Sequence, residues 1–492
     1  MTDSRVIIDR RPITVVFISR TYRFFLLLLL GFAFYAFVSA PPWAGLSPEG
    51  YKAVGAFFLC LILWVTQLIP LAITGLLAVA IVPLLGIMPA KQAFSYFGND
   101  AVFFILGAFI LSAAILKTGL STRLALLFLK GGVRSPRQLI WRILVSSAFL
   151  SCLMPEHAVA AFFLPIILEM ARALEYEPFG GSYGRTLFLA MAWGCIIGGV
   201  VTFLGGGRAP LALGILKELT DQDIGFLDWM KTTVVLAVPM LGVAFVVLTF
   251  YFRIDVESVE GINRALEARR KKLGMTSWGE KWVLLILLLA VYFWMFHGLK
   301  AGLANIAIAA VVILFTFKVV SWKDVEEYVN WGIILMYGGA ICLGRAMDSS
   351  GLIEWIAQKF LHYPEIIATH LGNWFGIGVP ATYVLFVLLS LVALFLTEMM
   401  SNSAVVAVLL PVAIGLAHSY QLDPRLMAYV VALPAGLAFL LPISTPAVAL
   451  AYSSGYLRIK DILIPGLMMN IIAWLLLVLV MKFWWPYLGM RY

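Results

Sequence analysis

Charged residues are scarce in this chain: only 12% of its 492 residues are Asp, Glu, Lys or Arg, while 62% are hydrophobic. A water-soluble protein carries about 25% charged residues and less than about 50% apolar ones. The scarcity of charge therefore excludes an ordinary soluble enzyme and a disordered chain. The sequence instead contains many apolar runs of membrane-spanning length, so it predicts an all-α polytopic membrane protein.

Cysteine and histidine are also scarce, with four cysteines and five histidines in the chain. All four cysteines lie in apolar runs, which excludes a disulfide-bonded secreted scaffold and favours reduced, packed thiols. The histidines form no metal-binding cluster, and the sequence has no His-Glu-x-x-His pair, Gly-x-Ser-x-Gly elbow or phosphate-binding lysine loop. We therefore predict a protein that is not an enzyme and uses no cofactor.

Eleven apolar runs have the length of membrane spans. They cover about residues 24–40, 51–69, 72–89, 101–118, 187–214, 232–252, 282–298, 302–318, 331–347, 427–455 and 464–485. Two further stretches, at about 138–172 and 374–418, are long and apolar but are interrupted midway by polar residues. Because neither fits a single span, each predicts a re-entrant helical hairpin that returns to the side from which it enters.

The basic residues predict the orientation of these spans. They cluster in the N-terminal segment 1–23, after the fourth span at 123–142, and in a polar linker at 253–281. Eleven crossings put all three clusters on one face, which should be the cytoplasmic one. We therefore expect a protein of the cytoplasmic (inner) membrane with its N-terminus inside and its C-terminus outside. The net charge of +9 comes from these loops and does not indicate binding to nucleic acid.

The linker at 253–281, which contains one short amphipathic helix, separates two similar halves, 24–252 and 282–492. Three segments match: ILSAAILKTGL ending at Leu120 with ICLGRAMDSSGL ending at Leu352, PEHAVAAFFLPI from Pro155 with SNSAVVAVLLPV from Ser401, and TFLGGGRAPLAL from Thr202 with FLLPISTPAVAL from Phe439. An odd number of spans lies between the copies, so the repeats would be inverted across the membrane. Inverted repeats with interrupted helices are typical of secondary transporters.

Four breaks interrupt the apolar pattern, two at the hairpin tips and two inside the spans 187–214 and 427–455. They lie at Pro155–His157, Gly205–Pro210, Ser401–Ser403 and Pro442–Pro446. Unpaired backbone is tolerated at membrane depth only where it lines a cavity or binds something. Half-helices that start at such breaks direct N–H groups and a positive dipole end at an anion, while carbonyls and hydroxyls can bind a cation. An anion carried with a coupling cation is therefore the expected cargo.

These residues resemble the divalent anion:sodium symporters, a family of dicarboxylate, citrate and sulfate carriers. In that family each hairpin tip reads Ser-Asn-Thr before a half-helix that ends in Leu-Pro, and each unwound span carries a Thr-Pro-Pro-Asn-like run. Here the second tip reads Ser401-Asn402-Ser403, followed by Leu410-Pro411, and the second unwound run keeps Thr445-Pro446. The resemblance covers nearly the whole chain. It implies a homodimeric carrier of a small dianion, with a hairpin-bearing domain that moves against a scaffold as an elevator.

The resemblance also implies site residues. In the second half, the ion-coupling residues would be Thr397, Ser401, Asn402 and Ser444, with a possible sodium ion at the first three. The substrate-binding residues there would be Asn402, Ser403 and Thr445. Apart from the resemblance, the position of Glu398 one turn before Ser401 favours a structural role, in which it locks this hairpin through backbone donors.

The first half departs from the family pattern. Glu156 and His157 stand where the tip should be neutral, and Arg208 follows a run of glycines in place of the Thr-Pro-Pro-Asn-like run. We therefore expect sodium coupling to be reduced or replaced at the first site. One hypothesis is that Arg208 pairs with Glu156 and its guanidinium stands in for the missing sodium.

Other roles for these three residues remain open. Arg208 could instead contact the substrate as a bidentate donor, with His157 donating to the same anion. Glu156 or His157 could carry a coupled proton, or the two could form an internal hydrogen bond without any role in transport. The expected cargo is a C4-dicarboxylate. The alternative is a proton-coupled or exchange carrier for sulfate or another inorganic anion.

Overall fold

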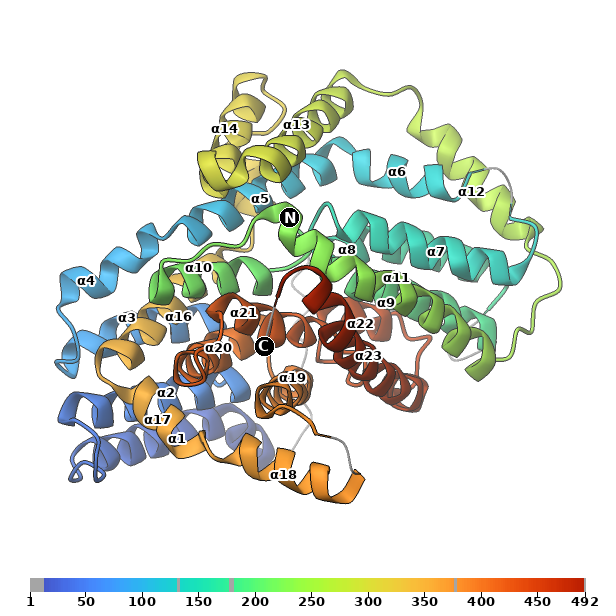
Figure 1. Cartoon of the computed structure of the whole chain (residues 1–492). Coiled ribbons are helices and arrows are strands. Elements are labelled where there is room, and N and C mark those ends of the chain that lie inside the picture. Colours follow the sequence, from blue (N-terminus) through green and yellow to red (C-terminus); the bar gives the residue numbers. More distant parts are fainter. Residues whose placement is uncertain (1–12, 131–132, 177–180, 376–377, 491–492) are drawn as a thin grey trace.

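The computed structural model describes residues 13–130, 133–176, 181–375 and 378–490, and all regular structure in these ranges is helical. Eight described helices are long and apolar enough to cross a membrane, and two more apolar helices are shorter. Each of the eleven ranges expected to be spans overlaps a helix or a pair of helices. The all-α membrane fold is therefore confirmed (Figure 1).

The first half and the linker contain thirteen of these elements. They are α1 (Ile13–Val38), α2 (Pro48–Thr66), α3 (Leu71–Leu84), α4 (Ala90–Ser95), η1 (Tyr96–Gly98), α5 (Asp100–Thr118), α6 (Leu120–Phe128), α7 (Pro136–Ser151), α8 (Glu156–Ala173), α9 (Ser182–Gly199), α10 (Arg208–Thr220), α11 (Phe226–Tyr251) and α12 (Glu260–Leu273).

The second half repeats the order of long helices, hairpin and broken helix. Its elements are α13 (Trp278–Ala301), α14 (Leu303–Thr316), α15 (Trp322–Tyr328), α16 (Trp331–Ser349), α17 (Leu352–Phe360), α18 (Tyr363–Phe375), α19 (Ala381–Met399), α20 (Asn402–Ser419), α21 (Pro424–Ala432), η2 (Pro434–Gly436), α22 (Pro446–Ser453) and α23 (Ile459–Tyr487).

Several boundaries differ from the expected ones. Helix α1 begins at Ile13, well before the predicted span, and α13 begins at Trp278, inside the predicted linker. The first break runs over residues 200–207 and leaves Arg208 as the first residue of α10. The second break, interrupted only by η2, extends over residues 433–445. Both breaks start earlier than the glycine and proline residues predict, because residues elsewhere in the fold hold the unwound backbone.

The two halves share unusual local features. Gly119 and Gly351 both adopt a left-handed conformation, with φ of +79° and +75°, and each precedes a nine-residue helix. Glycine fits such a position because it has no Cβ to clash with the carbonyl. The second arms of the hairpins, α8 and α20, have 18 residues each and contain Pro165 and Pro411 at the same position. The matched sequence segments therefore also share their local backbone structure, which supports the repeat.

The repeats interlock instead of packing as separate halves. Helix α3 packs on α16, and the repeat-related α5 packs on α14. The hairpin arm α8 contacts α22, and the corresponding arm α20 contacts α10. Each hairpin thus packs on the broken helices of both repeats, which brings the four breaks to the middle of the molecule (Figure 1).

Contacts between the ends of the helices show which connections lie on the same face of the molecule. On the face with the basic loops, called the basic face, ion pairs join Lys117 to Asp324 at 2.6 Å, Arg123 to Glu280 at 2.7 Å and Arg185 to Asp461 at 3.0 Å. On the opposite face, Ser47 Oγ donates to the Ser350 carbonyl at 2.9 Å and Trp484 Nε1 donates to the Lys231 carbonyl at 3.0 Å. This grouping matches the expected order of crossings, and the cytoplasmic location of the basic face stays a prediction.

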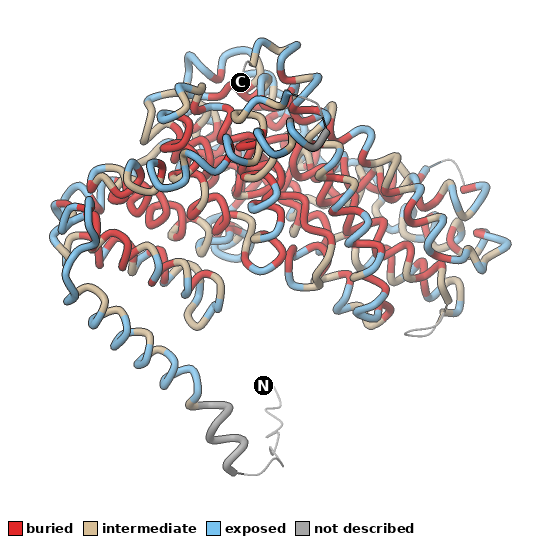
Figure 2. Tube along the Cα trace, turned by 60° about the horizontal axis from the view of Figure 1, so that its bottom comes forward, coloured by how far each residue is buried: buried red, intermediate tan, exposed pale blue. Residues whose placement is uncertain are grey.

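Helix α1 extends away from the rest of the molecule, with its described surface exposed along most of its length (Figure 2). Its residues 21–38 are apolar, and Phe34, Phe37 and Val38 touch the region of Gly55 on α2. In a bilayer this helix would face lipid on most of its circumference.

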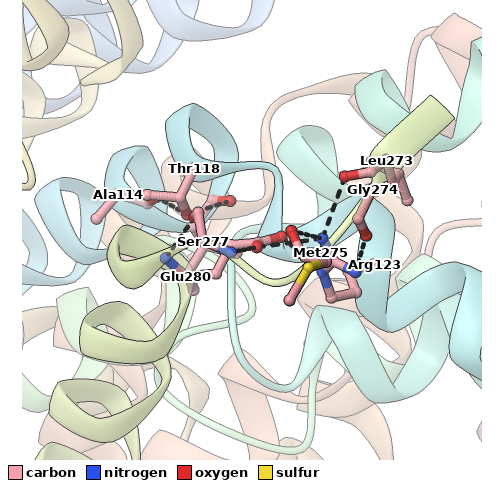
Figure 3. A network of polar contacts seen from close by, with 9 residues as sticks. Ala114, Thr118, Arg123, Leu273, Gly274, Met275, Ser277 and Glu280 are labelled. Carbon is pink, nitrogen blue, oxygen red and sulfur yellow. Dashed lines mark hydrogen bonds and ion pairs between the residues drawn. The ribbon is translucent and has the colours of Figure 1, made fainter.

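Arg123 fastens the linker to the basic face (Figure 3). From α6 its guanidinium reaches Glu280 at the start of α13, with Nε 2.7 Å from Oε1 and Nη2 3.2 Å from Oε2. The same guanidinium donates to the carbonyls of residues 273–275 at the end of α12. The cation thus satisfies carbonyls that a helix end leaves free. The linker is therefore docked, not a free tether.

We expect Arg123→Ala to open the linker locally, because it removes charge-assisted hydrogen bonds that together contribute about 2 kcal/mol or more. Limited proteolysis within residues 273–277 should accelerate by about tenfold or more. The matched control is Arg137→Ala, at an exposed position near the start of α7. Equal cleavage rates in the two variants would contradict this role for Arg123.

Candidate functional site

The four breaks meet at one cavity of about 790 Å³, called the site cavity. Sites for small ligands have volumes of about 300–1,000 Å³. Eight of the nine predicted site residues line it, namely Glu156, His157, Arg208, Ser401, Asn402, Ser403, Ser444 and Thr445. The ninth, Thr397, is fully buried and hydrogen-bonded to Asn402. The structure therefore brings residues from both repeats together.

Opposite the four breaks, the wall of the site cavity is formed by the connection between α2 and α3 and by the start of α16. Its residues Thr66, Gln67 and Asn330 line the cavity and are exposed. Met399 and Ile443, across from them, are exposed as well, so the mouth lies between these two groups. Asp324, shortly before Asn330, forms an ion pair with Lys117 on the basic face. The site cavity therefore opens toward the face that we predict to be cytoplasmic.

Four helices begin at the site cavity. Their first residues or N-caps are Glu156 of α8, Arg208 of α10, Ser401 before α20 and Thr445 before α22. Each helix start places the partial positive charge of its helix dipole at the cavity. The arrangement favours an anion, and Arg208 adds a full positive charge.

Arg208 and Glu156 form a buried pair. Arg208 Nη1 lies 3.5 Å from Glu156 Oε2, and the two residues are only 2% and 5% exposed. Arg208 Nη2 and Glu156 Oε2 have no hydrogen-bond partner among the described residues. A buried pair with free donor and acceptor atoms retains capacity to bind a ligand, an ion or water.

Three glycines make room for the guanidinium. A Cβ added at Gly436 would lie 2.1 Å from Arg208 Nε and 2.5 Å from Cζ, and one at Gly206 would lie 2.7 Å from Nη1. A Cβ at Gly199 would lie 2.9 Å from Glu156 Oε2. Gly436 belongs to the second repeat, so Arg208 reaches across the interface between the repeats. Any larger residue at Gly436 would displace the charge.

The unwound segment 200–207 already has partners at the cavity. The Glu156 amide donates to the Gly205 carbonyl at 2.9 Å, and the Tyr337 hydroxyl donates to the Gly207 carbonyl. A sodium ion at the first site would need oxygens from this segment. Each of these carbonyls keeps a second lone pair, but the adjacent guanidinium would repel a cation placed beside them.

His157 lies at the wall of the site cavity and is half-buried. Its ring packs edge-to-face on Phe109, with 6.3 Å between the ring centroids. Its imidazole has no hydrogen bond to any described residue. Its N–H is therefore available to a ligand in the cavity.

The second tip carries a cluster of oxygens. Thr397 Oγ1 lies 2.9 Å from Asn402 Oδ1 and 2.6 Å from the Ala435 carbonyl. One hydroxyl proton cannot serve both acceptors at once, so lone pairs remain free in this cluster. Sodium is a hard cation that favours oxygen ligands, and Ser401 lies beside the cluster. The donor set therefore fits a cation.

The second unwound segment is held by capping hydroxyls and a buried carboxylate. Thr445 Oγ1 accepts from the Val448 amide at 3.3 Å, and Ser444 Oγ donates to the Leu441 carbonyl at 2.7 Å. Upstream, Glu398 accepts three backbone N–H groups from residues 439–441. The predicted locking role of Glu398 is confirmed, although its donors lie in the broken helix and not in the hairpin.

Several residues at the site were not predicted from the sequence. Tyr337, Gln67 and Asn330 lie outside the four breaks, and Gly436 lies in the part of the second break that starts before Pro442, so no local pattern pointed to them. Gln67 has one signal in the backbone, a left-handed conformation with φ of +50° for a residue other than glycine. Such a conformation is visible only in the structure.

Comparison with known proteins gives a match along almost the whole chain. A family described as "Sodium:sulfate symporter transmembrane region" matches residues 21–491. A sodium-dependent dicarboxylate transporter, SdcS, of Staphylococcus saprophyticus is 26% identical over 470 residues, which cover 89% of this chain and 88% of the relative. A transporter of the same name from Staphylococcus aureus strain RF122 has the same identity and coverage. Among solved structures, the Alcanivorax borkumensis YdaH transporter aligns with a TM-score of 0.49 at 16% identity, covering 80% of this chain and 87% of that one.

Proposed function

Because the chain belongs to the sodium:sulfate symporter family, and is thus a membrane transporter and not an enzyme, we propose that it moves a C4-dicarboxylate across the cytoplasmic membrane. The single observation that carries this proposal is the meeting of four helix starts and Arg208 at one cavity. A dianion of four carbons fits a volume of about 790 Å³ with room for water. The relatives named sodium-dependent dicarboxylate transporters support the same substrate class.

Coupling differs between the two repeats in this proposal. In the first repeat, the guanidinium of Arg208 stands in for a sodium ion beside Glu156. In the second repeat, sodium binds at the oxygens of Thr397, Ser401 and Asn402. The carrier then needs fewer sodium ions per cycle than one with two intact sites.

Alternating access in this proposal is of elevator type, in a homodimer. The hairpins and broken helices would move as one body against α2, α3, α5, α13, α14 and α16. Two observations support it: the hairpins are held by the broken helices, and the site cavity lies between them and the α2–α3 connection with the start of α16. The homodimer is an expectation from the family.

The test is uptake of labelled succinate into proteoliposomes, with sodium and pH gradients varied separately. We expect the uptake rate to depend on sodium concentration with a Hill coefficient near one. Malate should compete with succinate, and the pH gradient should have no effect. A strict requirement for two sodium ions would exclude Arg208 as a substitute cation. Competition by sulfate but not by malate, or uptake driven by pH alone, would favour the inorganic-anion alternative, for which Glu156 and His157 supply titratable groups.

The oxygen cluster at the second tip gives a prediction about sodium affinity. We expect Thr397→Ala to raise the sodium concentration for half-maximal uptake by about tenfold, the equivalent of one lost ligand of about 1.4 kcal/mol. The control is Ser419→Ala at the far end of α20, where the hydroxyl only bonds the Gly415 carbonyl. An unchanged sodium dependence in the Thr397 variant would remove this cluster from the coupling site.

A further inference from the structure

A second, smaller cavity of about 290 Å³ lies away from the site cavity. Its walls are the start of α5, one side of α10, and the connection between α13 and α14. Helix α5 ends near Lys117 on the basic face, so its start lies near the opposite face. The smaller cavity therefore lies near the face opposite to the one on which the site cavity opens.

The two cavities are related by the internal repeat. Gly119 and Gly351 give an offset of 232 residues (351 less 119) between the repeats. With this offset, four residues that line the smaller cavity correspond to four that line the site cavity: Gly98, Asp100, Ala101 and Phe104 correspond to Asn330, Gly332, Ile333 and Met336. The same offset relates residues 302–304, in the smaller cavity, to residues 70–72, in the site cavity.

The broken helices α10 and α22 supply a third wall to each cavity, at a larger offset of 236 residues (446 less 210). Pro210 and Leu213 of α10 line the smaller cavity, and Pro446 and Ala449 of α22 line the site cavity at the same spacing. Three walls of the smaller cavity therefore have a repeat-related wall in the site cavity, whereas the wall formed by residues 223–224 has none. An inverted repeat held in one conformation is expected to contain two cavities of different size with repeat-related walls.

We propose that the smaller cavity is the closed form of the second entrance to the transport site, with Gly214 as the residue that lets it close. This proposal rests on the alternating access proposed above. It adds where the second entrance lies and which residue allows that entrance to close. A Cβ added at Gly214 would lie 2.7 Å from the Ala101 Cβ and 3.1 Å from Asn99 Oδ1. Asn99 Nδ2 also lies 3.5 Å from Glu218 Oε2 of α10. Close approach of α10 to the start of α5 thus depends on the absence of a side chain.

A side chain at Gly214 should shift the protein toward the conformation in which this entrance is open. The reporters are single Ala304→Cys and Ala449→Cys variants, one in each cavity, treated with a membrane-impermeant maleimide from either side of oriented vesicles. Ala304 is 7% exposed and the four native cysteines are buried or half-buried. In the parent chain we expect rapid labelling of the Ala449→Cys variant from the basic face and slow labelling of the Ala304→Cys variant.

With Gly214→Leu added, labelling of the Ala304→Cys variant from the opposite face should accelerate about tenfold, and labelling of the Ala449→Cys variant should slow, because overpacking destabilises only the closed entrance. The control is Gly242→Leu on α11, where an added Cβ meets nothing within 4 Å. If Gly214→Leu does not fold, Gly214→Ser provides the same readout at smaller amplitude. Unchanged labelling in a folded Gly214 variant would overturn the proposal. The assay needs no substrate, so failure of dicarboxylate uptake would leave its outcome intact.

Discussion

Replacing Arg208 by alanine should abolish transport while membrane insertion remains normal. The side chain supplies the one full positive charge of the described residues that line the site cavity, and its loss leaves Glu156 as a buried, unpaired carboxylate. Breaking a buried ion pair in this way costs about 3–5 kcal/mol. We therefore expect initial uptake of succinate into proteoliposomes to fall by more than about 100-fold, with similar amounts of protein in the membrane.

Three further variants separate the possible roles of Arg208. Arg185→Ala is the matched control, because Arg185 also pairs with a buried carboxylate, Asp461 at 3.0 Å, but outside the site cavity. We expect it to retain most of its transport. Glu156→Gln should keep substrate binding if Arg208 contacts the anion, and Arg208→Ala with Glu156→Gln should recover protein stability but not uptake. Near-normal uptake by the single Arg208→Ala variant would remove this residue from the site.

The positions of the spans, the repeat and the breaks followed from the sequence because each has a local cause. Span length follows from bilayer thickness, and a helix ends where proline or a polar tip interrupts an apolar run. The repeat was visible because positions such as Gly119 and Gly351 require a glycine for the same backbone conformation. Such features depend on a few neighbouring residues.

The extent of the breaks and the full lining of the site cavity did not follow from the sequence. The second unwound segment starts well before Pro442, because Glu398 and Asn470 supply the hydrogen bonds that its backbone lacks. Likewise, Gly436 matters only because Arg208 arrives against it from the other repeat. These effects come from residues far apart in the chain, and no local pattern encodes them.

The structure also gives the two repeats different electrostatic roles. The first repeat carries a fixed charge pair and occupied carbonyls, whereas the second carries neutral oxygens with free lone pairs around Thr397. A fixed guanidinium cannot dissociate, so it attracts an anion on both sides of the membrane without contributing to a gradient. In the coupling that we propose, a dissociable cation at the second repeat is therefore the one that links transport to an ion gradient.

Replacing Glu398 by glutamine should be the most destabilising conservative change in the second repeat. Glu398 is 4% exposed and accepts four hydrogen bonds: its Oε1 from the Phe439 and Leu440 amides and from Asn470 Nδ2, and its Oε2 from the Leu441 amide, at 2.6–3.1 Å. Glutamine has the same shape but replaces one acceptor oxygen by an NH₂ group, which would face an N–H donor.

The loss should be about 2–4 kcal/mol, because a buried donor left without an acceptor costs about 1–3 kcal/mol and the charge assistance of the others is also lost. We expect the apparent Tm of the detergent-solubilised protein to fall by about 5 °C or more. Uptake should fall as well, since residues 439–441 lead directly to Ser444 and Thr445 at the site cavity. The control is Glu354→Gln on α17, where the carboxylate is exposed. A Glu398→Gln variant as stable as this control would mean that the unwound backbone does not need a carboxylate, and that its conformation is held by Asn470 and the capping hydroxyls alone.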